Sequence, residues 1–253
     1  MSVDAGELRR AVRAGEVIPW YQPIVELATG TIQGVEALAR WPRPDGMVPP
    51  DAFIPVAEAD DLILELDLAV TRQALADLSR WQRLRPGFEL NVNLSGRRLD
   101  SDAGVADLIA AVDAAGVTPG TVCAELTETA RPVAADGGAA ALDRLRAAGL
   151  PIWLDDFGAG HTSLQDVIRL PLDGIKFDRS FAGQLDLPRA EPLLGALTAA
   201  AHRIGLRVSL EGIETGAQAE AARRLGCDLG QGFLWSPPVP AQQVDGWLRA
   251  SDG

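Results

Sequence analysis

The sequence predicts an α/β fold, a TIM-type (β/α)8 barrel variant with one antiparallel strand near the N-terminus. Short apolar runs typical of buried strands alternate with longer segments of helical periodicity, which requires a parallel sheet covered by helices. The chain has 253 residues, an ordinary size for one such barrel. A short turn joins the first two strand-like runs, so one of them must run antiparallel to the other.

The expected elements follow one another in a regular order. An amphipathic helix is expected at 4–14, and a hairpin of strands at 18–24 and 31–41 comes after it. From Pro50 to Trp81 the apolar residues recur with helical spacing, which predicts one buried helical face. The remaining expected strands cover 88–92, 122–126, 151–154, 174–177, 207–210 and 228–233, and the other helices cover 104–115, 134–148, 164–170, 192–204, 217–225 and 241–250.

Composition favours one cytoplasmic domain. No low-complexity linker, charge block or repeat interrupts the pattern, so we expect a single domain over 1–253, with the barrel at about 15–240. The first residues lack a basic start and an apolar stretch, and no apolar run approaches the length of a membrane span. Cys123 and Cys227 lack metal-ligand spacing and are expected to be buried, reduced and without a functional role.

The net charge restricts the kinds of partner. At −12 it argues against a nucleic-acid duplex or an anionic membrane, because both are bound chiefly through positive charge. A small anionic ligand remains compatible with this charge. Such a ligand would need bound cations, or a few well-placed Lys and Arg side chains, to enter an acidic pocket.

Asp155 and Asp156 are adjacent at the end of an apolar strand-like run, directly before a turn that contains Gly158 and Gly160. Two neighbouring carboxylates repel each other, and burial is tolerated only with a cation, a basic partner or solvation. Side chains alternate along a strand, so both carboxylates can point inward only if the strand ends between them. We expect the strand to end there.

Polar residues also stand at or near the ends of the other expected strands. In a barrel the carboxyl ends of the strands meet at one mouth, where active sites of this fold lie. A single acid after a strand is more often a helix N-cap, but seven strand ends with polar residues indicate a site. The set consists of Glu36, Asn93, Glu125, Asp155 with Asp156, Lys176, Glu211 and Gln231.

Oxygen ligands dominate this set. Glu36, Asn93, Glu125 and Asp155 suit a hard divalent cation such as Mg²⁺ or Mn²⁺, and zinc is disfavoured because no His or Cys lies among them. One carboxylate could bridge two ions, an arrangement that serves phosphoryl hydrolysis.

Lys176, Glu211 and Glu214 are further candidates at the same mouth. A lysine is unusual in an apolar strand, and two interpretations are open. Lys176 either forms an ion pair with Asp178 or a neighbouring acid, or it orients a water or a phosphate oxygen. Glu211 and Glu214 lie three residues apart after a strand, and either could act as general base or metal ligand.

Together these segments resemble the EAL-domain family of cyclic di-GMP-specific phosphodiesterases, which act in bacterial second-messenger signalling. The resemblance extends from about Trp20 to Pro238. A single triplet would carry no weight, but nine motifs occur in the order of the family. They are Tyr21-Gln22-Pro23-Ile24, Glu36-Ala37-Leu38 with Arg40-Trp41, Phe53-Ile54-Pro55 with Ala57-Glu58, Asn93-Leu94-Ser95, Glu125-Leu126-Thr127-Glu128, Asp155-Asp156-Phe157-Gly158, Ile175-Lys176-Phe177-Asp178, Glu211-Gly212-Ile213-Glu214-Thr215 and Gln231-Gly232-Phe233.

The resemblance implies a role for each matching position. Glu211 would be the general base, Lys176 would hold the attacking water, and Glu214 would be a metal-site or structural partner. Glu128 would steady the loop that follows the paired aspartates. Two ions of Mg²⁺ or Mn²⁺ are implied, with Glu36, Asn93, Glu125, Asp155 and Asp156 as their ligands, and Gln22, Leu38, Arg40, Asp178 and Gln231 as the residues that contact the substrate.

That loop departs from the family's usual sequence. Ala159 and His161 stand where the family more often has Thr and Tyr. These two substitutions are expected to affect the dynamics of the loop, its coupling to dimerisation and the rate of turnover. They leave the metal-site residues intact. A hydrogen-bonded loop histidine is a simpler interpretation of His161 than a pH switch.

Three functions are compatible with these residues. The first is hydrolysis of cyclic di-GMP to linear pGpG by attack of a metal-activated water, in a homodimer of the kind expected from the family. The second is a non-catalytic cyclic di-GMP receptor, although such chains generally lose metal or base residues that are all present here. The third is a Mg²⁺ enzyme that abstracts a proton beside a carboxylate, which leaves Gln22 and Arg40 unexplained.

Overall fold

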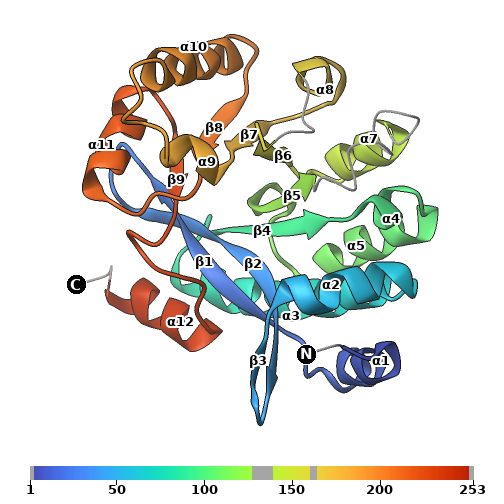
Figure 1. The fold of residues 1–253 in the computed structure, drawn as a ribbon. Coiled ribbons are helices and arrows are strands. Elements are labelled where there is room, and N and C mark those ends of the chain that lie inside the picture. Colours follow the sequence, from blue (N-terminus) through green and yellow to red (C-terminus); the bar gives the residue numbers. More distant parts are fainter. Residues whose placement is uncertain (1–2, 127–138, 160–163, 251–253) are drawn as a thin grey trace.

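The structure, a computed structural model, describes residues 3–126, 139–159 and 164–250 (Figure 1). Eight strands close into a barrel in the order β1-β9-β8-β7-β6-β5-β4-β2, and β2 pairs back with β1. Strand β1 (Ile18–Glu26) runs antiparallel to both of its neighbours, β2 (Ile32–Arg43) and β9 (Leu229–Gln231). The predicted barrel with one antiparallel strand near the N-terminus is therefore confirmed.

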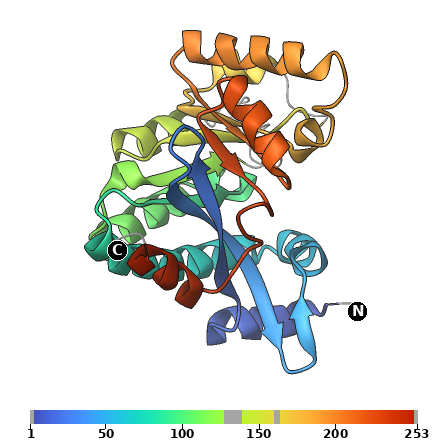
Figure 2. The ribbon, with the colours of Figure 1, turned by 90° about the vertical axis from the view of Figure 1, so that its left-hand side faces the viewer.

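The other barrel strands run parallel to one another. A short additional strand, β3 (Gly46–Val48), pairs with the end of β2 and forms a hairpin that projects from the barrel (Figures 1 and 2). The sequence pattern did not predict β3, because three residues are too few to show an alternation. The parallel strands are β4 (Glu89–Leu94), β5 (Val122–Leu126), β6 (Ile152–Phe157), β7 (Gly174–Phe177) and β8 (Arg207–Leu210).

Helices surround the barrel, as Figures 1 and 2 show. The predicted helical stretch that starts at Pro50 is divided into two helices, because Asp61 adopts a left-handed backbone with φ of 53° between them. None of the helices in the described part of the chain is both long and apolar enough to cross a membrane. The helices are α1 (Ala5–Ala14), α2 (Pro50–Ala59), α3 (Ile63–Leu84), α4 (Gly96–Leu99), α5 (Asp102–Ala115), α7 (Ala139–Ala147), α8 (Leu164–Arg169), α9 (Arg179–Ala182), α10 (Ala190–Arg203), α11 (Gly216–Arg224) and α12 (Ala241–Ala250).

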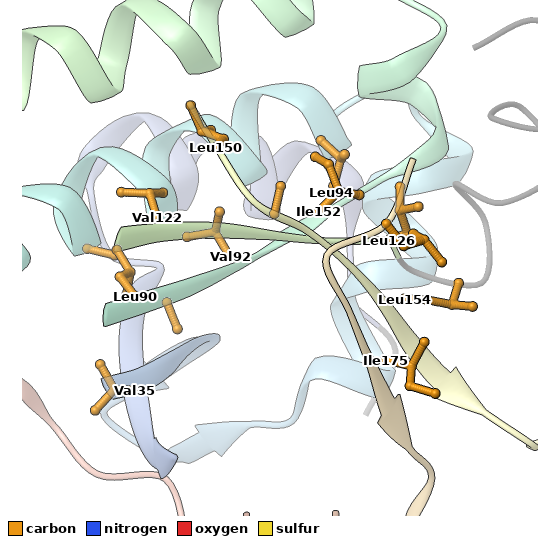
Figure 3. Close-up of a cluster of buried hydrophobic side chains, with 14 of the residues drawn as sticks. Val35, Leu90, Val92, Leu94, Val122, Leu126, Leu150, Ile152, Leu154 and Ile175 are labelled. Carbon is orange, nitrogen blue, oxygen red and sulfur yellow. The ribbon is translucent and has the colours of Figure 1, made fainter. Parts of the chain in front are cut away.

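Side chains that face outward from the strands form the main core. They alternate along each strand with side chains that face the barrel axis, and they pack under the surrounding helices. Figure 3 shows part of this layer, which is built of β-branched and leucine side chains on β2, β4, β5, β6 and β7 and of Leu150, just before β6. The labelled residues of this layer are Val35, Leu90, Val92, Leu94, Val122, Leu126, Leu150, Ile152, Leu154 and Ile175.

The barrel interior has its own small apolar layer. Ile24, Cys123, Trp153 and Leu229 are buried together, and they come from strands on opposite sides of the barrel, so they fill its axis. Trp153 lies across Gly174 on the neighbouring strand, where an added Cβ would be 2.5 Å from the indole ring. Only glycine leaves room for the indole ring at that point.

A polar network fastens the last helix to the barrel. Asp245 on α12 accepts hydrogen bonds from the indole N–H of Trp81 at 2.6 Å and from Arg80 at 3.1 Å, both on α3. Arg80 also pairs with Asp77, which accepts a 2.6 Å hydrogen bond from the hydroxyl of Tyr21 on β1. Strand β1, α3 and α12 are thereby tied together on one side of the barrel.

We expect the Asp245→Ala variant to lower the free energy of unfolding by about 2 kcal/mol, because the buried indole N–H of Trp81 loses its acceptor. Urea unfolding followed by circular dichroism measures the change. The Glu220→Ala variant, which removes an exposed ion pair with Arg223, is the matched control and should change stability by less than about 0.5 kcal/mol. Equal stability of the two variants would contradict this account of the network.

Candidate functional site

Lys176 lies at the centre of a ring of carboxylates at the C-terminal mouth of the barrel. Its side chain is buried, and its Nζ is 3.0 Å from Asp155, 3.1 Å from Glu125, 3.3 Å from Glu36 and 2.5 Å from Glu211. These acids come from β6, β5, β2 and the residue after β8. Of the two interpretations of Lys176, the ion pair with neighbouring acids describes its contacts here.

Amide side chains hold the carboxylates of this ring in place. Gln231 Nε2 donates to Glu36 at 2.8 Å and to Gln22 at 3.1 Å, and Asn93 Nδ2 donates to Glu36 at 3.4 Å. Asn91 Nδ2 donates to Glu125 at 2.6 Å. Buried carboxylates are tolerated only when they are paired and hydrogen-bonded, so these amides are part of the site's architecture.

The paired aspartates are both half-buried on the last part of β6. The expectation that the strand ends between them was wrong, since β6 continues to Phe157. A β-bulge changes the side-chain alternation at this point. Strand β6 advances three residues, from Leu154 to Phe157, while β7 advances two, from Ile175 to Phe177. Asp156 has a φ of 52°, so the bulge turns its side chain out of the strand's regular alternation.

Three carboxylates converge closely enough to hold a metal ion. Asp155, Asp156 and Glu211 each offer an oxygen, and these oxygens lie within 4.8 Å of one another. Asp155 Oδ1 is buried and accepts no hydrogen bond from the described residues, although Lys176 is near. An oxygen-only set of this kind fits a hard divalent cation, with Glu36, Glu125 and Asn93 on neighbouring strands.

Burial shifts the titration of these groups. It raises the pKa of Glu125 and of Glu211 above the usual value, and Lys176 opposes the shift in both cases. Burial and the charge of Asp155 raise the pKa of Asp156 to about 6. Burial disfavours the charged form of Lys176, but the surrounding carboxylates outweigh it and raise its pKa well above the ordinary value. Lys176 is therefore a fixed positive charge at neutral pH.

Two cavities meet at this mouth. The first, which we name the acid cavity, has a volume of about 370 Å³ and is lined by three carboxylates of the ring, those of Glu36, Asp155 and Glu211. The second, the neighbouring cavity, has a volume of about 520 Å³ and lies between α2, α3 and the ends of β2 and β4. Leu38 and Arg40 line both cavities, Asp155 lines the first and Asp156 the second. The paired aspartates therefore stand at the boundary between two adjoining cavities.

The remaining predicted site residues do not all lie at the cavities. Gln22 and Glu214 line the acid cavity, and Glu214 is exposed outside the trio of converging acids. Asp178 caps α9 by accepting a hydrogen bond from the backbone N–H of Ser180, and it lies outside the lining of both cavities. Ala159 is exposed, while Glu128 and His161 lie outside the described residues.

Sequence reasoning missed four polar residues at the mouth. Asn91 precedes Asn93 by two positions, so strand alternation alone would place both on the same face. Asp67 and Ser95 line the neighbouring cavity and share a 2.7 Å hydrogen bond, but Asp67 lies on α3 and carries no strand-end signal. Arg179 lines the acid cavity directly after Asp178.

Asp67 is held in an unusual environment. Burial raises its pKa to about 6, against the opposing effects of Arg98 and of the Ser95 hydroxyl, while Glu58 adds to the rise. Arg98 is itself buried, and burial lowers its pKa. The folded protein therefore keeps this carboxylate ionised at neutral pH at a cost in stability.

The Asp67→Asn variant should show how the ionisation of Asp67 affects the free energy of unfolding. The pKa of Asp67 rises from 3.8 to about 6 on folding, so the folded state takes up a proton as pH falls through about 6 and the wild type gains stability. We expect the variant's stability, relative to the wild type, to fall by about 2 kcal/mol between about pH 7.5 and pH 4, because a pKa unit is worth about 1.4 kcal/mol and the last part of the gain comes below pH 4. Urea unfolding at several pH values measures this difference, and a constant difference would contradict it.

Known proteins are similar to this chain in sequence and in fold. Residues 5–238 match the family described as EAL domain. The cyclic di-GMP phosphodiesterase NbdA of Pseudomonas aeruginosa is 38% identical over 253 residues, which cover 96% of this chain and 32% of NbdA. The chain therefore spans about a third of the length of that curated relative.

Solved structures give the same result. The PaMucR phosphodiesterase in complex with c-di-GMP superposes with a TM-score of 0.87 at 33% identity, over 94% of this chain and 98% of that one. The manganese and cy-diGMP complex of Klebsiella pneumoniae BlrP1 superposes with a TM-score of 0.78 at 29% identity, over 88% of this chain and 56% of that one.

Proposed function

The chain belongs to the EAL domain family, and on that premise we propose that it is a metal-dependent phosphodiesterase that hydrolyses cyclic di-GMP to linear pGpG. The observation that carries the proposal is the buried ring around Lys176, with three converging acids at the boundary between two cavities. The relatives named above support the choice of substrate. A receptor that only binds the ligand would not need to retain every acid of this ring.

The acids of the ring would hold the metal ions. Two divalent cations would lower the pKa of a water and neutralise charge on the phosphoryl oxygens. The donor set fits them, because it consists of oxygens in a partly buried cluster without His or Cys. Glu36, Asn93, Glu125, Asp155 and Asp156 are the proposed ligands.

Residues around the ring would position and deprotonate the attacking water. Lys176 holds a positive charge within 3.3 Å of four carboxylates and would orient the water by hydrogen bonding. Glu211, whose pKa is raised by burial, is the proposed general base. The water oxygen bonds to phosphorus, Glu211 takes its proton, and the bond from phosphorus to the 3′ oxygen breaks. That oxygen leaves with a proton from solvent.

The two cavities would divide the dinucleotide between them. Pockets for ligands of this size usually measure 300–1,000 Å³, and the two volumes here are about 370 and 520 Å³. Arg40 and Leu38 line both, so they would contact the ligand where it crosses from one cavity to the other. Gln22 and Gln231 would close the acid cavity on the side of β1 and β9.

Chromatography of cyclic di-GMP incubated with the purified protein tests the proposal. We expect pGpG with Mn²⁺ or Mg²⁺ and none with EDTA, with activity restored by excess Mn²⁺, because the acid cluster needs the cations. Tight binding of the ligand in metal-replete buffer without pGpG would contradict catalysis and favour a receptor.

The same assay on variants tests the ring. The Glu36→Ala variant should lose at least about 100-fold in kcat, because Lys176, Gln231 and a metal ion would all lose a partner. Glu220 lies on the exposed face of α11, so the Glu220→Ala variant should retain full activity. Full activity of the Glu36 variant, free of contaminating phosphodiesterase, would refute the assignment.

We also propose a homodimer through the face formed by α8. Leu164 and Ile168 lie four residues apart on this helix, with 61% and 80% of their surface exposed. Side chains at this spacing share one helical face, so the two form a small apolar patch beside the loop after β6.

The Ile168→Glu variant should shift the dimer to a monomer, because a charge replaces the most exposed apolar side chain of that patch. Light scattering at several protein concentrations measures the mass. Leu193 on α10 is also exposed, at 54%, so the Leu193→Glu variant is a matched control that should leave the mass unchanged. A wild type that is monomeric at every concentration would rule out the dimer.

A further inference from the structure

Three basic side chains of the described residues line the acid cavity, and their environments differ. Lys176 is surrounded by four carboxylates and is already assigned to the attacking water. Arg40 is half-buried, and its Nη1 donates to the backbone carbonyl of Ala39 at 2.8 Å. Arg179 is exposed, and it forms no ion pair or side-chain hydrogen bond with any residue that the structure describes. Among the described residues, Arg179 is therefore the cation of this cavity with all of its side-chain donors unused.

The backbone of Arg179 is held firmly beside the catalytic acids. The loop after β8 passes so close that a Cβ added to Gly212 would be 2.4 Å from the Cβ of Arg179 and 2.9 Å from its Cα. Gly212 also has a φ of 69°, which disfavours other residues. On the other side, Asp178 caps α9 and fixes the turn that begins it. The side chain of Arg179 thus starts from a fixed point at the edge of the cavity.

The acid cavity is rich in negative charge, so an anionic ligand needs a cation there. Four carboxylates from the part of the chain that the structure describes line it, those of Glu36, Asp155, Glu211 and Glu214, and the whole chain carries a net charge of −12. A ligand with two phosphodiesters is a dianion, and metal ions at the proposed ligands would neutralise only the phosphodiester next to them. The other phosphodiester would still need a cation. A guanidinium suits this task because its planar fork donates two parallel hydrogen bonds to phosphate oxygens.

We propose that Arg179 is a substrate-binding residue, whose guanidinium contacts the phosphodiester of the ligand that is not being hydrolysed. This inference rests on the proposed function and goes beyond it by adding a residue that binds substrate without taking part in the bond-breaking step. It predicts an effect on affinity and KM and none on kcat, because the contact is equal in the ground state and the transition state.

Equilibrium binding and steady-state kinetics with cyclic di-GMP test the proposal in parallel. The Arg179→Ala variant should raise Kd and KM about tenfold and leave kcat within about twofold, as expected for loss of a charge-assisted hydrogen bond. The Arg179→Lys variant keeps the charge and should recover most of the affinity. Binding by the wild type should also weaken with salt more steeply than binding by the Arg179→Ala variant. Arg203 is exposed on α10, outside both cavities, and the Arg203→Ala variant is the matched control that should bind as the wild type does.

The outcomes separate this proposal from the proposed function. A wild type that binds cyclic di-GMP without hydrolysing it would overturn the enzyme assignment, and the tenfold loss of affinity in the Arg179→Ala variant would still support Arg179. Unchanged affinity in that variant, or a fall in kcat with unchanged KM, would overturn the role of Arg179 while the hydrolysis stands. A wild type that neither binds nor hydrolyses the ligand would overturn both.

Discussion

The charge of Lys176 is the interaction on which the rest of the site depends. A buried carboxylate without a partner costs several kcal/mol, and here four of them face one ammonium group at the mouth of the barrel. Removal of that charge would leave Glu125, which is fully buried, with only an amide partner. The lysine also joins β2, β5, β6 and the end of β8, which are far apart in sequence. Its role in the architecture is therefore established by its contacts alone, and the proposed chemistry makes use of the same geometry.

The barrel beneath the ring supplies the rigidity that these charges need. Trp153 and the other residues of the interior apolar layer are buried on the axis below the carboxylates and pack the barrel there. Gly174 permits this packing, because any Cβ there would overlap the indole ring. Beyond Trp153 on the same strand, the bulge in β6 places two adjacent carboxylates at the mouth of the barrel. Apolar packing and a local irregularity thus act together to hold polar groups in a fixed arrangement.

The adjoining cavities explain why so many different elements contribute residues. The acid cavity is built by strand ends, whereas the neighbouring cavity also uses α2 and α3, the two helices after β3. Arg40 stands between the cavities, and Arg179 stands at the edge of one of them. An acidic protein can accept an anionic ligand under these conditions, since positive charge is supplied locally by guanidinium groups and, as proposed, by metal ions.

Strand and helix periodicity was sufficient to predict the barrel, its antiparallel strand and most element positions, because burial imposes those patterns on every strand and helix. The positions of polar residues at strand ends also predicted that Glu36, Glu125, Asp155, Lys176 and Glu211 would meet, since parallel strands deliver their carboxyl ends to one mouth. Asp67 and Arg179 had no such signal, because their places depend on how α3 and the loop after β8 pack against the barrel. The bulge in β6 was equally hidden, since alternation predicts where side chains of a regular strand point and gives no information on an extra residue. Tertiary packing alone decided those features, because each depends on contacts between segments that are distant in the chain.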